Sequence, residues 1–312
     1  MAHVPHESAS PGRDGTVTIR IFLVVLFAIW SIAFTAIKHL REIFSPMELV
    51  CARFLPASII CLVYLLLRRE HRREILLVLQ SAPLRILAMG LCGVAGYNYF
   101  LYLGQSEIKP GAAALITTLA PLFTLLLAIP FLRERVPLRR IVGIVLAFAG
   151  LYFVVRWGRV GLGNVIGIAM PEIKYALITT LAPLCWTLYT VIGKKLVHER
   201  SPLVVTYLSI VFGTIPVLPF VSGDFLHTFV HMDATHWLAL FHLSVLSTLI
   251  GFWIWFAALR RLPATSVASF IYLNPPFAAA FGWLFFGEEV TELFLLGSAV
   301  VLFGLYLSQS RR

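Results

Sequence analysis

Charged residues are scarce in this sequence. Only 13% of the 312 residues are Asp, Glu, Lys or Arg, whereas 59% are hydrophobic. A soluble domain carries roughly 25% charged residues, and one soluble core of this length could not enclose so much apolar surface. The composition therefore excludes an ordinary soluble protein and indicates a chain whose main solvent is lipid.

Cysteine is also scarce, and its spacing excludes two common frameworks. The four cysteines, Cys51, Cys61, Cys92 and Cys185, lie in apolar stretches and form no C-x-x-C pair. We therefore predict neither a zinc site nor a disulfide framework. No cofactor is expected: the glycine-rich stretch at 161–167 has the spacing G-x-G-x-x-x-G, and no strand precedes it.

Acidic residues are absent from the middle of the apolar stretches. All fifteen fall in expected loops, tails or span ends. A carboxylate in mid-membrane is the usual relay for protons or cations, and polytopic enzymes commonly need acids for metal binding or acid–base chemistry. Their absence favours a facilitator or an exchanger over a carboxylate-coupled antiporter, and it argues against an enzyme.

Long apolar stretches dominate what remains. A helix needs about 20 mostly apolar residues to cross the hydrocarbon layer, and lipid obliges its backbone groups to pair internally. We predict an all-α membrane protein with ten transmembrane helices. The spans are residues 19–38, 46–67, 84–103, 110–132, 138–156, 176–195, 203–221, 237–258, 265–286 and 292–309. The polar residues 1–18 are expected to form a disordered cytoplasmic tail.

The net charge is +10, and the Lys and Arg residues are distributed along the sequence as in membrane proteins whose basic loops set their orientation. With the N-terminus inside, the inner segments carry 18 Lys and Arg residues and the outer segments carry six. Basic runs lie between apolar stretches rather than on a soluble face, which argues against nucleic-acid binding. We expect a multi-pass protein of the bacterial inner membrane with both termini in the cytoplasm.

The two halves of the sequence resemble each other. A shift of 154 residues carries Leu119-Ala120-Pro121 onto Leu273-Asn274-Pro275, and a shift of 156 carries Trp30 onto Trp186. Each half holds five predicted spans. Because an odd number of crossings brings the chain to the opposite side of the membrane, the second half begins there and has the opposite orientation. We predict two inverted repeats, 19–156 and 176–310, joined by a loop at 157–175. Secondary transporters commonly use this plan, with the substrate site at the repeat interface.

An ordered set of short motifs resembles the EamA-domain permeases of the drug/metabolite transporter superfamily. The first half carries Ile29-Trp30-Ser31, Ser45-Pro46-Met47-Glu48-Leu49, Leu119-Ala120-Pro121-Leu122 and Leu132-Arg133-Glu134-Arg135; the second carries Cys185-Trp186-Thr187, Pro202, Leu273-Asn274-Pro275 and Phe286-Gly287-Glu288-Glu289. The resemblance covers residues 19–310, although Ser209 stands where the first half has Arg53. It implies a membrane transport protein, but its relatives move amino acids, sugars, nucleotides and other metabolites.

Polar aromatic residues and amides recur in the middle of the spans. A buried phenol or indole N–H needs a hydrogen-bond partner, which a wet cavity or a ligand supplies; interhelical packing is the alternative interpretation. The candidate substrate-binding residues are Trp30, Phe34, Tyr97, Asn98, Tyr102, Trp186, Tyr189, Thr190, Trp253, Tyr272 and Asn274. Tyr99 and Trp255 belong to the same set. The repeat-equivalent Trp30 and Trp186 are expected to meet.

Three other features have two interpretations each. The repeat-equivalent Pro121 and Pro275 would each hinge a gate or make a static kink. Arg53 would bind a substrate carboxylate or phosphate, or pair structurally with Glu48 or helix carbonyls. The histidine-containing segment 222–236 would hold a metal or sense pH, or form a solvated loop. We favour the structural interpretation for Arg53 and the solvated loop for the histidines.

The favoured function is export of amino acids or related metabolites by alternating access. Efflux of drugs or quaternary-ammonium cations is the alternative, because aromatic walls attract cations. A polytopic lipid-modifying enzyme is the rival from another class. The expected partners are a small-molecule substrate and the lipid bilayer, and the sequence leaves monomer and homodimer open.

Overall fold

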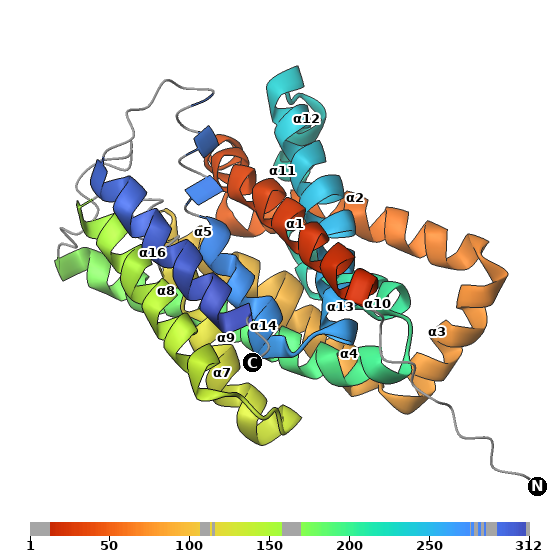
Figure 1. Ribbon diagram of the computed structural model, residues 1–312. Helices are drawn as coiled ribbons and strands as arrows, with labels where there is room; N and C mark the ends of the chain where they lie inside the picture. Colours follow the sequence, from red (N-terminus) through yellow and green to blue (C-terminus); the bar gives the residue numbers. More distant parts are fainter. Residues whose placement is uncertain are drawn as a thin grey trace, which may run out of the picture.

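The fold is taken from a computed structural model that describes residues 13–106, 113, 116–157, 170–274, 276–277, 280–281, 284 and 292–309 (Figure 1). Every regular element in these residues is a helix. The predicted all-α class is therefore confirmed for the described chain.

The helices follow the predicted spans closely. In the first half they are α1 (Arg13–Leu40), α2 (Pro46–Leu67), α3 (Arg69–Ser81), α4 (Pro83–Met89), η1 (Gly90–Gly96), α5 (Tyr97–Gly104), α7 (Ala120–Leu132) and α8 (Leu138–Trp157). In the second half they are α9 (Met170–Glu199), α10 (Pro202–Thr214), η2 (Ile215–Phe220), α11 (Gly223–Val230), α12 (Ala234–Phe241), η3 (His242–Ile250), α13 (Gly251–Arg261), α14 (Ala264–Ala268), η4 (Ser269–Leu273) and α16 (Glu292–Gln309). Each predicted span coincides, at least in part, with one of these helices or a consecutive run of them.

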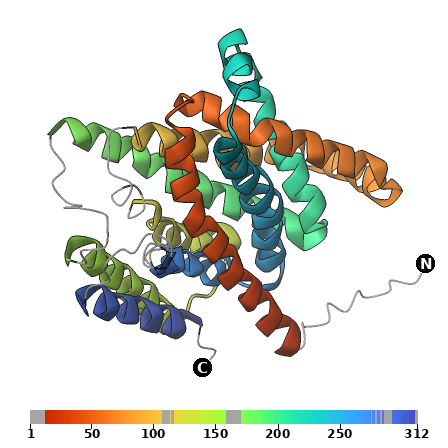
Figure 2. The same ribbon diagram turned by 90° about the horizontal axis from the view of Figure 1, so that it is seen from above.

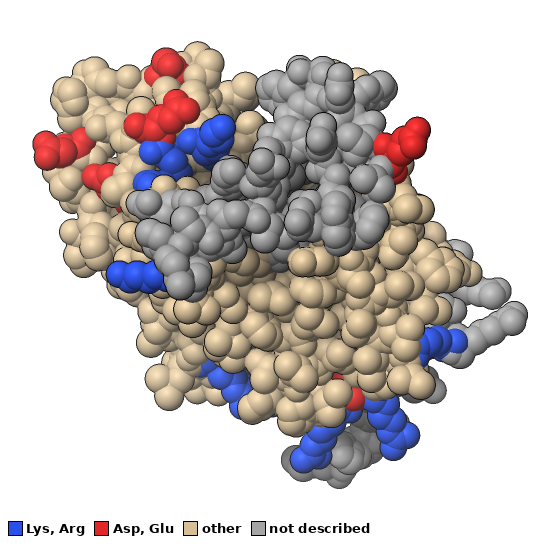
Figure 3. All heavy atoms as spheres, turned by 90° about the vertical axis from the view of Figure 1, so that its left-hand side faces the viewer, with Lys and Arg blue, Asp and Glu red and all other residues tan. Residues whose placement is uncertain are grey.

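The outer surface of the helices is apolar. Six described helices or helix runs are long and apolar enough to cross a membrane: Thr16–Leu40, Pro46–Leu67, Pro83–Gly104, Lys174–Glu199, Pro202–Phe220 and Ala234–Arg261. Leu67 and Leu84 remain 72% and 77% exposed, which water would penalise and lipid does not. Figure 3 shows a broad uncharged area between an upper end with most of the acids and a lower end with mainly Lys and Arg. The chain is an integral membrane protein.

Local sequence determines where α2 and α10 begin. Ser45 caps α2 and forms a capping box with Glu48: the Ser45 N–H donates to Glu48 Oε2 at 2.8 Å, and the Glu48 N–H donates to Ser45 Oγ at 3.4 Å. Pro46 and Pro202 each open a helix after a serine, where a missing N–H has no cost. The shift of 156 residues relates these two prolines, so the repeat extends to the helix starts.

Two helix runs contain π-helical stretches at repeat-equivalent positions. These are η1 and η3, and a shift of 154 residues carries η1 onto 244–250, inside η3. A π stretch shifts the phase of the helix and frees backbone groups. The Asn98 amide donates to Gly93 O and Val94 O at 3.1 and 2.8 Å, and Thr248 Oγ1 donates to Leu243 O at 2.8 Å. Both stretches lie beside the aromatic cluster described below.

The two halves of the chain are interlaced. Helix α1 packs against η3 and α13 of the second half, and α9 packs against α5 and α7 of the first half. Figures 1 and 2 both show α8 and α16, the last helices of each half, running side by side. Glycines allow that approach, since a Cβ at Gly143 would lie 2.6 Å from Gly304 O. The largest enclosed side chains come from both halves, including Phe27, Tyr102, Tyr189 and Trp255.

Both described ends of the chain lie at the same end of the molecule. Near the start of α1, Arg20 Nη2 donates to the backbone oxygen of Gln309, the last residue of α16, at 3.2 Å. Helix α1 begins at Arg13, inside the predicted tail, and residues 1–12 lie outside the described residues. Helix α9 likewise begins at Met170, inside the predicted inter-repeat loop.

Two segments outside the predicted spans are helical, and one of them is predicted as a loop from the sequence. Helix α3 carries Arg69, Arg72 and Arg73 beside Leu76 and Leu77, an arrangement suited to the surface of a membrane. The predicted histidine loop at 222–236 contains α11 and the start of α12. Ser222 and Asp233 cap these helices through their side chains, and the buried Phe225 packs on Phe44 and Phe229. Because α11 buries only a short apolar face, a search for long apolar spans does not detect it.

The predicted hinge at Pro121 is not a kink in a continuous helix. Pro121 lies in the first turn of α7, directly after a turn at 118–119. Proline is well tolerated there because the first N–H groups of a helix have no intrahelical partner. In the second half, η4 narrows to a 3-10 helix just before Asn274. Pro275 lies outside the described residues.

Candidate functional site

A narrow hollow lies between the two halves of the chain. Its volume is about 50 Å³, and both repeats line it. The lining residues are Trp30, Ala33, Phe34, Ile37, Arg53, Tyr97, Leu101, Trp186, Phe252, Ile271 and Asn274. Five of the predicted substrate-binding residues therefore meet here: Trp30, Phe34, Tyr97, Trp186 and Asn274.

An aromatic cluster forms one wall of the hollow. The rings of Trp30 and Trp186 meet edge to face, with centroids 5.4 Å apart and planes at 83°. Trp255 lies 5.7 Å from Trp30 and 5.3 Å from Trp186, and Phe252 contacts both. The contact that the repeat predicts between Trp30 and Trp186 is present, while the part these residues play in transport stays a prediction.

Arg53 is the buried cation of the hollow. Its side chain comes from α2, is 5% exposed, and stacks on Phe54 with 5.0 Å to the ring centroid. Nε donates to Thr248 Oγ1 at 2.9 Å, and Nη1 donates to Asn98 Oδ1 and to the Tyr102 hydroxyl, both at 3.0 Å. The predicted pairing with Glu48 is not formed.

Several predicted site residues support the hollow from behind rather than lining it. Asn98 and Tyr102 are fully buried and hold Arg53. The Tyr189 hydroxyl lies 3.2 Å from Ser209 Oγ, and Thr190 accepts a 3.3 Å bond from Trp255 Nε1. All four are satisfied inside the protein, which fits the interhelical interpretation of mid-span polar groups.

Trp253 does not face the hollow. It lies on the outer side of α13 and is 40% exposed, whereas Trp255, two residues along, is 1% exposed and belongs to the aromatic cluster. Two residues differ by about 200° around an α-helix, so only one of the pair faces inward. Tyr99, also of the predicted set, contacts Phe100.

Buried polar atoms near the hollow lack partners among the described residues. Trp186 Nε1 is an unpaired donor, Asn274 Oδ1 is an unpaired acceptor, and the Tyr272 hydroxyl is unpaired although its side chain is fully buried. Unpaired buried groups are rare in proteins because each costs free energy. These atoms are themselves enclosed, so the accessible lining of the hollow is mainly apolar and aromatic, with enclosed polar groups beside it.

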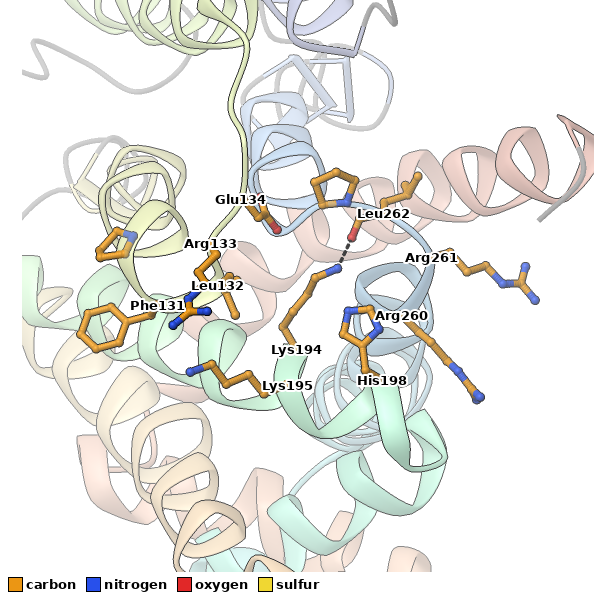
Figure 4. A pocket seen from close by; sticks show the side chains of 12 residues that line it. Phe131, Leu132, Arg133, Glu134, Lys194, Lys195, His198, Arg260, Arg261 and Leu262 are labelled. Carbon is orange, nitrogen blue, oxygen red and sulfur yellow. Dashed lines mark hydrogen bonds between the residues drawn. The ribbon is translucent and has the colours of Figure 1, made fainter. Parts of the chain in front are cut away.

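A second and larger cavity opens at the end of the molecule where α7, α9 and α13 finish. Its volume is about 730 Å³. Figure 4 shows Arg133, Lys194, Lys195, Arg260 and Arg261 around it, with Glu134 as the carboxylate among its lining residues. We call it the basic cleft. It is larger than the hollow, but charge rather than enclosed shape dominates it, so we treat it as an entrance.

Buried polar contacts join neighbouring helices at the basic cleft. Lys194 Nζ donates to Leu259 O and Leu262 O at 2.6 Å each, capping the end of α13; Figure 4 shows the bond to Leu262. Glu134 accepts from the Ala264 N–H at 2.6 Å and from Thr265 Oγ1 at 3.0 Å, at the start of α14. Both contacts join elements that would have to separate if this end opened.

The histidines of the outer segment do not form one cluster. His242 Nε2 contacts Ile29 O at 3.1 Å, His227 stacks on His231, and His236 stacks on His39 of α1 at 4.2 Å between centroids. His39, His236 and Asp233 have ligand atoms within 4.8 Å of one another. Imidazole lone pairs lie in the ring plane, and planes inclined by 9° direct them side by side rather than at one ion.

Asp233 has a structural role at the same place. Its Oδ1 accepts from the His236 N–H at 2.9 Å and from Thr235 Oγ1 at 2.7 Å. These hydrogen bonds, led by that of the backbone, lower the pKa of Asp233 from its ordinary value. The carboxylate is therefore accounted for as the cap of α12.

Comparison with known proteins identifies the family. The EamA-like transporter family matches residues 18–156 and again 173–309. An uncharacterized transporter of Archaeoglobus fulgidus is 29% identical over 292 residues, covering 94% of this chain and 99% of the relative. A probable terminal-alkyne amino-acid exporter of Streptantibioticus cattleyicolor is 27% identical over 295 residues, covering 93% and 92%.

A solved structure supports the fold. A crystal structure matches with a TM-score of 0.74 at 16% sequence identity, covering 96% of this chain and 97% of that one. At this identity the likeness shows the fold alone. With the double family match and the apolar outer surface, it leads to one conclusion: this chain is a member of the EamA-like transporter family, a multi-pass membrane protein that transports a small molecule and is not an enzyme.

Proposed function

We propose that this protein is a secondary transporter of the bacterial inner membrane that exports amino acids or related metabolites by alternating access. The observation that carries the proposal is the hollow at which Trp30 of the first repeat meets Trp186 of the second. Inverted-repeat transporters place the substrate at this interface. The printed name of the Streptantibioticus relative, an amino-acid exporter, supports the substrate class.

The topology belongs to the same proposal. Ten crossings place two five-helix repeats in opposite orientations, with both termini in the cytoplasm. The bond from Arg20 to Gln309 supports an even number of crossings, because it joins the start of the first helix to the end of the last. The basic cleft at this end supports a cytoplasmic location, because Lys and Arg accumulate on that side.

Alternating access requires that the two ends close in turn. The shift of 156 residues relates Lys38 to Lys194, yet Lys194 is 7% exposed and bonded, whereas Lys38 is exposed. Two equivalent residues in different surroundings are what a carrier closed at one end would contain. This difference supports alternating access with the basic end closed in the present arrangement.

A flux experiment tests the proposal. Purified protein in proteoliposomes would be assayed with each of the twenty amino acids, and the wild type is expected to move at least one of them. Trp30→Ala and Trp186→Ala should each reduce that flux by about tenfold or more, since each removes a wall of the hollow.

Trp253→Ala is the matched control, since it removes the same side chain from the outer surface of α13. It should leave the flux close to that of the wild type. Wild-type vesicles that move no amino acid would refute the substrate class. Full flux in both inner variants would refute the site.

A further inference from the structure

Arg53 carries a charge that the described chain does not neutralise. None of the ion pairs among the described residues includes it. Glu48, the nearest acid in sequence, accepts from the Ser45 N–H in the capping box of α2. A buried cation in a membrane protein normally has a partner of opposite charge, because an unpaired one is costly in low-dielectric surroundings.

Neutral groups hold the guanidinium in one orientation. A guanidinium has five N–H donors, and Nε and Nη1 use three of them on Thr248, Asn98 and Tyr102. Asn98 is itself fixed, because its amide nitrogen donates to two carbonyls of η1. The remaining nitrogen, Nη2, has no partner among the described residues and is not one of the enclosed unpaired atoms. Arg53 lines the hollow, so Nη2 is open to a ligand.

The same hollow offers complementary groups for the rest of a zwitterion. The faces of Trp30 and Tyr97 attract cations, and Asn274, which also lines the hollow, has an enclosed acceptor, Oδ1, without a partner among the described residues. Trp186 Nε1 is likewise an enclosed donor without such a partner, so a ligand reaches either atom only if the side chains around it move. No carboxylate is among the lining residues, so the site lacks a strong anchor for a simple cation.

We propose that Arg53 binds the carboxylate of the transported molecule, and that the substrate class is small metabolites with a carboxylate next to an apolar or aromatic body. The inference rests on the proposed transport function and deepens it. A guanidinium binds a carboxylate through charge-assisted bonds with a fixed geometry. The carboxylate of the substrate then supplies the negative charge that neutralises Arg53.

The basic cleft is an independent observation in favour of an anionic group. Five Lys and Arg side chains surround it, and its carboxylate, Glu134, is occupied by the start of α14. A cleft lined by one sign of charge concentrates ligands of the other sign. Carboxylates would gather at the end from which an exporter loads.

A binding experiment separates this inference from transport itself. Trp30 and Trp186 line the hollow and Trp255 packs on both, so tryptophan fluorescence in the purified protein reports on occupancy. The four probes are L-phenylalanine, 3-phenylpropionate, L-phenylalaninamide and phenethylamine, which share one ring and differ in carboxylate and amine. The two carboxylates should bind at least about tenfold more tightly than the amide and the amine, as charge-assisted bonds imply.

Two variants test the residue. Arg53→Gln should abolish the preference for the carboxylates, and Arg53→Lys should keep part of it because the charge remains without the planar fork. Trp253→Ala should retain the full preference. If Arg53→Gln does not fold, the four-probe comparison on the wild type decides alone.

Results that refute the role of Arg53 differ from results that refute the proposed transport function. Equal binding of phenethylamine and L-phenylalanine, or no response to either carboxylate, would overturn the role of Arg53 even if vesicles export amino acids. Carboxylate-selective binding without amino-acid flux would leave Arg53 in place and refute only the exporter assignment.

Discussion

At the scale of single residues, the inward and outward tryptophans of α13 differ in what they contribute. Trp255 is 1% exposed and packs on Phe27, Trp30 and Trp186. Trp255→Ala should lower the free energy of unfolding by about 3–5 kcal/mol, as for other large buried rings. Trp253→Ala should change it by far less. Thermal unfolding of both variants in one detergent checks the contrast, and equal losses would contradict the assignment of faces.

The sequence allowed part of this site to be predicted. Trp30 and Trp186 were identifiable because the repeat relates them, and Phe34 follows one turn after Trp30. Trp253 and Trp255 both belong to the predicted set, and the sequence alone did not show which of them faces inward, because the π stretch η3 shifts the phase of the helix just before them. The sequence also could not predict that Nη2 of Arg53 lacks a partner, because this depends on where α5 and η3 place Asn98, Tyr102 and Thr248.

At the scale of helices, glycine sets the distance between η1 and α10. A Cβ at Gly90 would lie 2.5 Å from Gly213 N and 2.8 Å from Ser209 O, both backbone atoms. Gly90→Ala should therefore force the helices apart and destabilise the protein by about 1–3 kcal/mol. Gly223→Ala is the control, because nothing lies within 4 Å of that Cβ. Melting temperatures in detergent test this prediction. An unchanged melting temperature of Gly90→Ala would show that the two helices move apart at little cost.

The polar contacts at the basic cleft give another prediction for these elements. Lys194→Met removes two bonds from a charged donor, each worth roughly 1.5–3 kcal/mol, so the closed end should open more often. A cysteine placed at Ala264, which is fully buried, should then react faster with a maleimide. Lys195→Met, a change to the exposed neighbour, should leave the rate unchanged. Equal rates in both variants would argue that other contacts keep this end closed.

At the scale of the whole molecule, long apolar stretches and the placement of charge were sufficient to predict most of the long helices, and the repeat related the two halves to one another. The positions of α3 and α11 were not predictable in this way, because short amphipathic helices have no long apolar run. The sequence predicted that the two halves pack together but not which helices make the contacts. The contacts of α1 with η3 and α13 depend on side chains more than 200 residues apart.

The topology itself is testable at this scale. Reporter tags placed before Arg13 and after Gln309 should both be protected from a protease added outside intact cells. A tag inserted at Gly223, between η2 and α11, should be cut, since this segment lies on the other side of the membrane in the proposed topology. Cleavage of only one terminal tag would mean an odd number of crossings.

The interlacing of the two repeats has a consequence for biogenesis. Neither repeat has a complete interior of its own, because α1 packs against η3 and α13, which are synthesised some 200 residues later. The first repeat must therefore wait in the bilayer, half-assembled, until the second has been inserted. Two separately encoded fragments, 1–157 and 170–312, should accordingly reconstitute flux when produced in the same cell, while each fragment alone should be degraded.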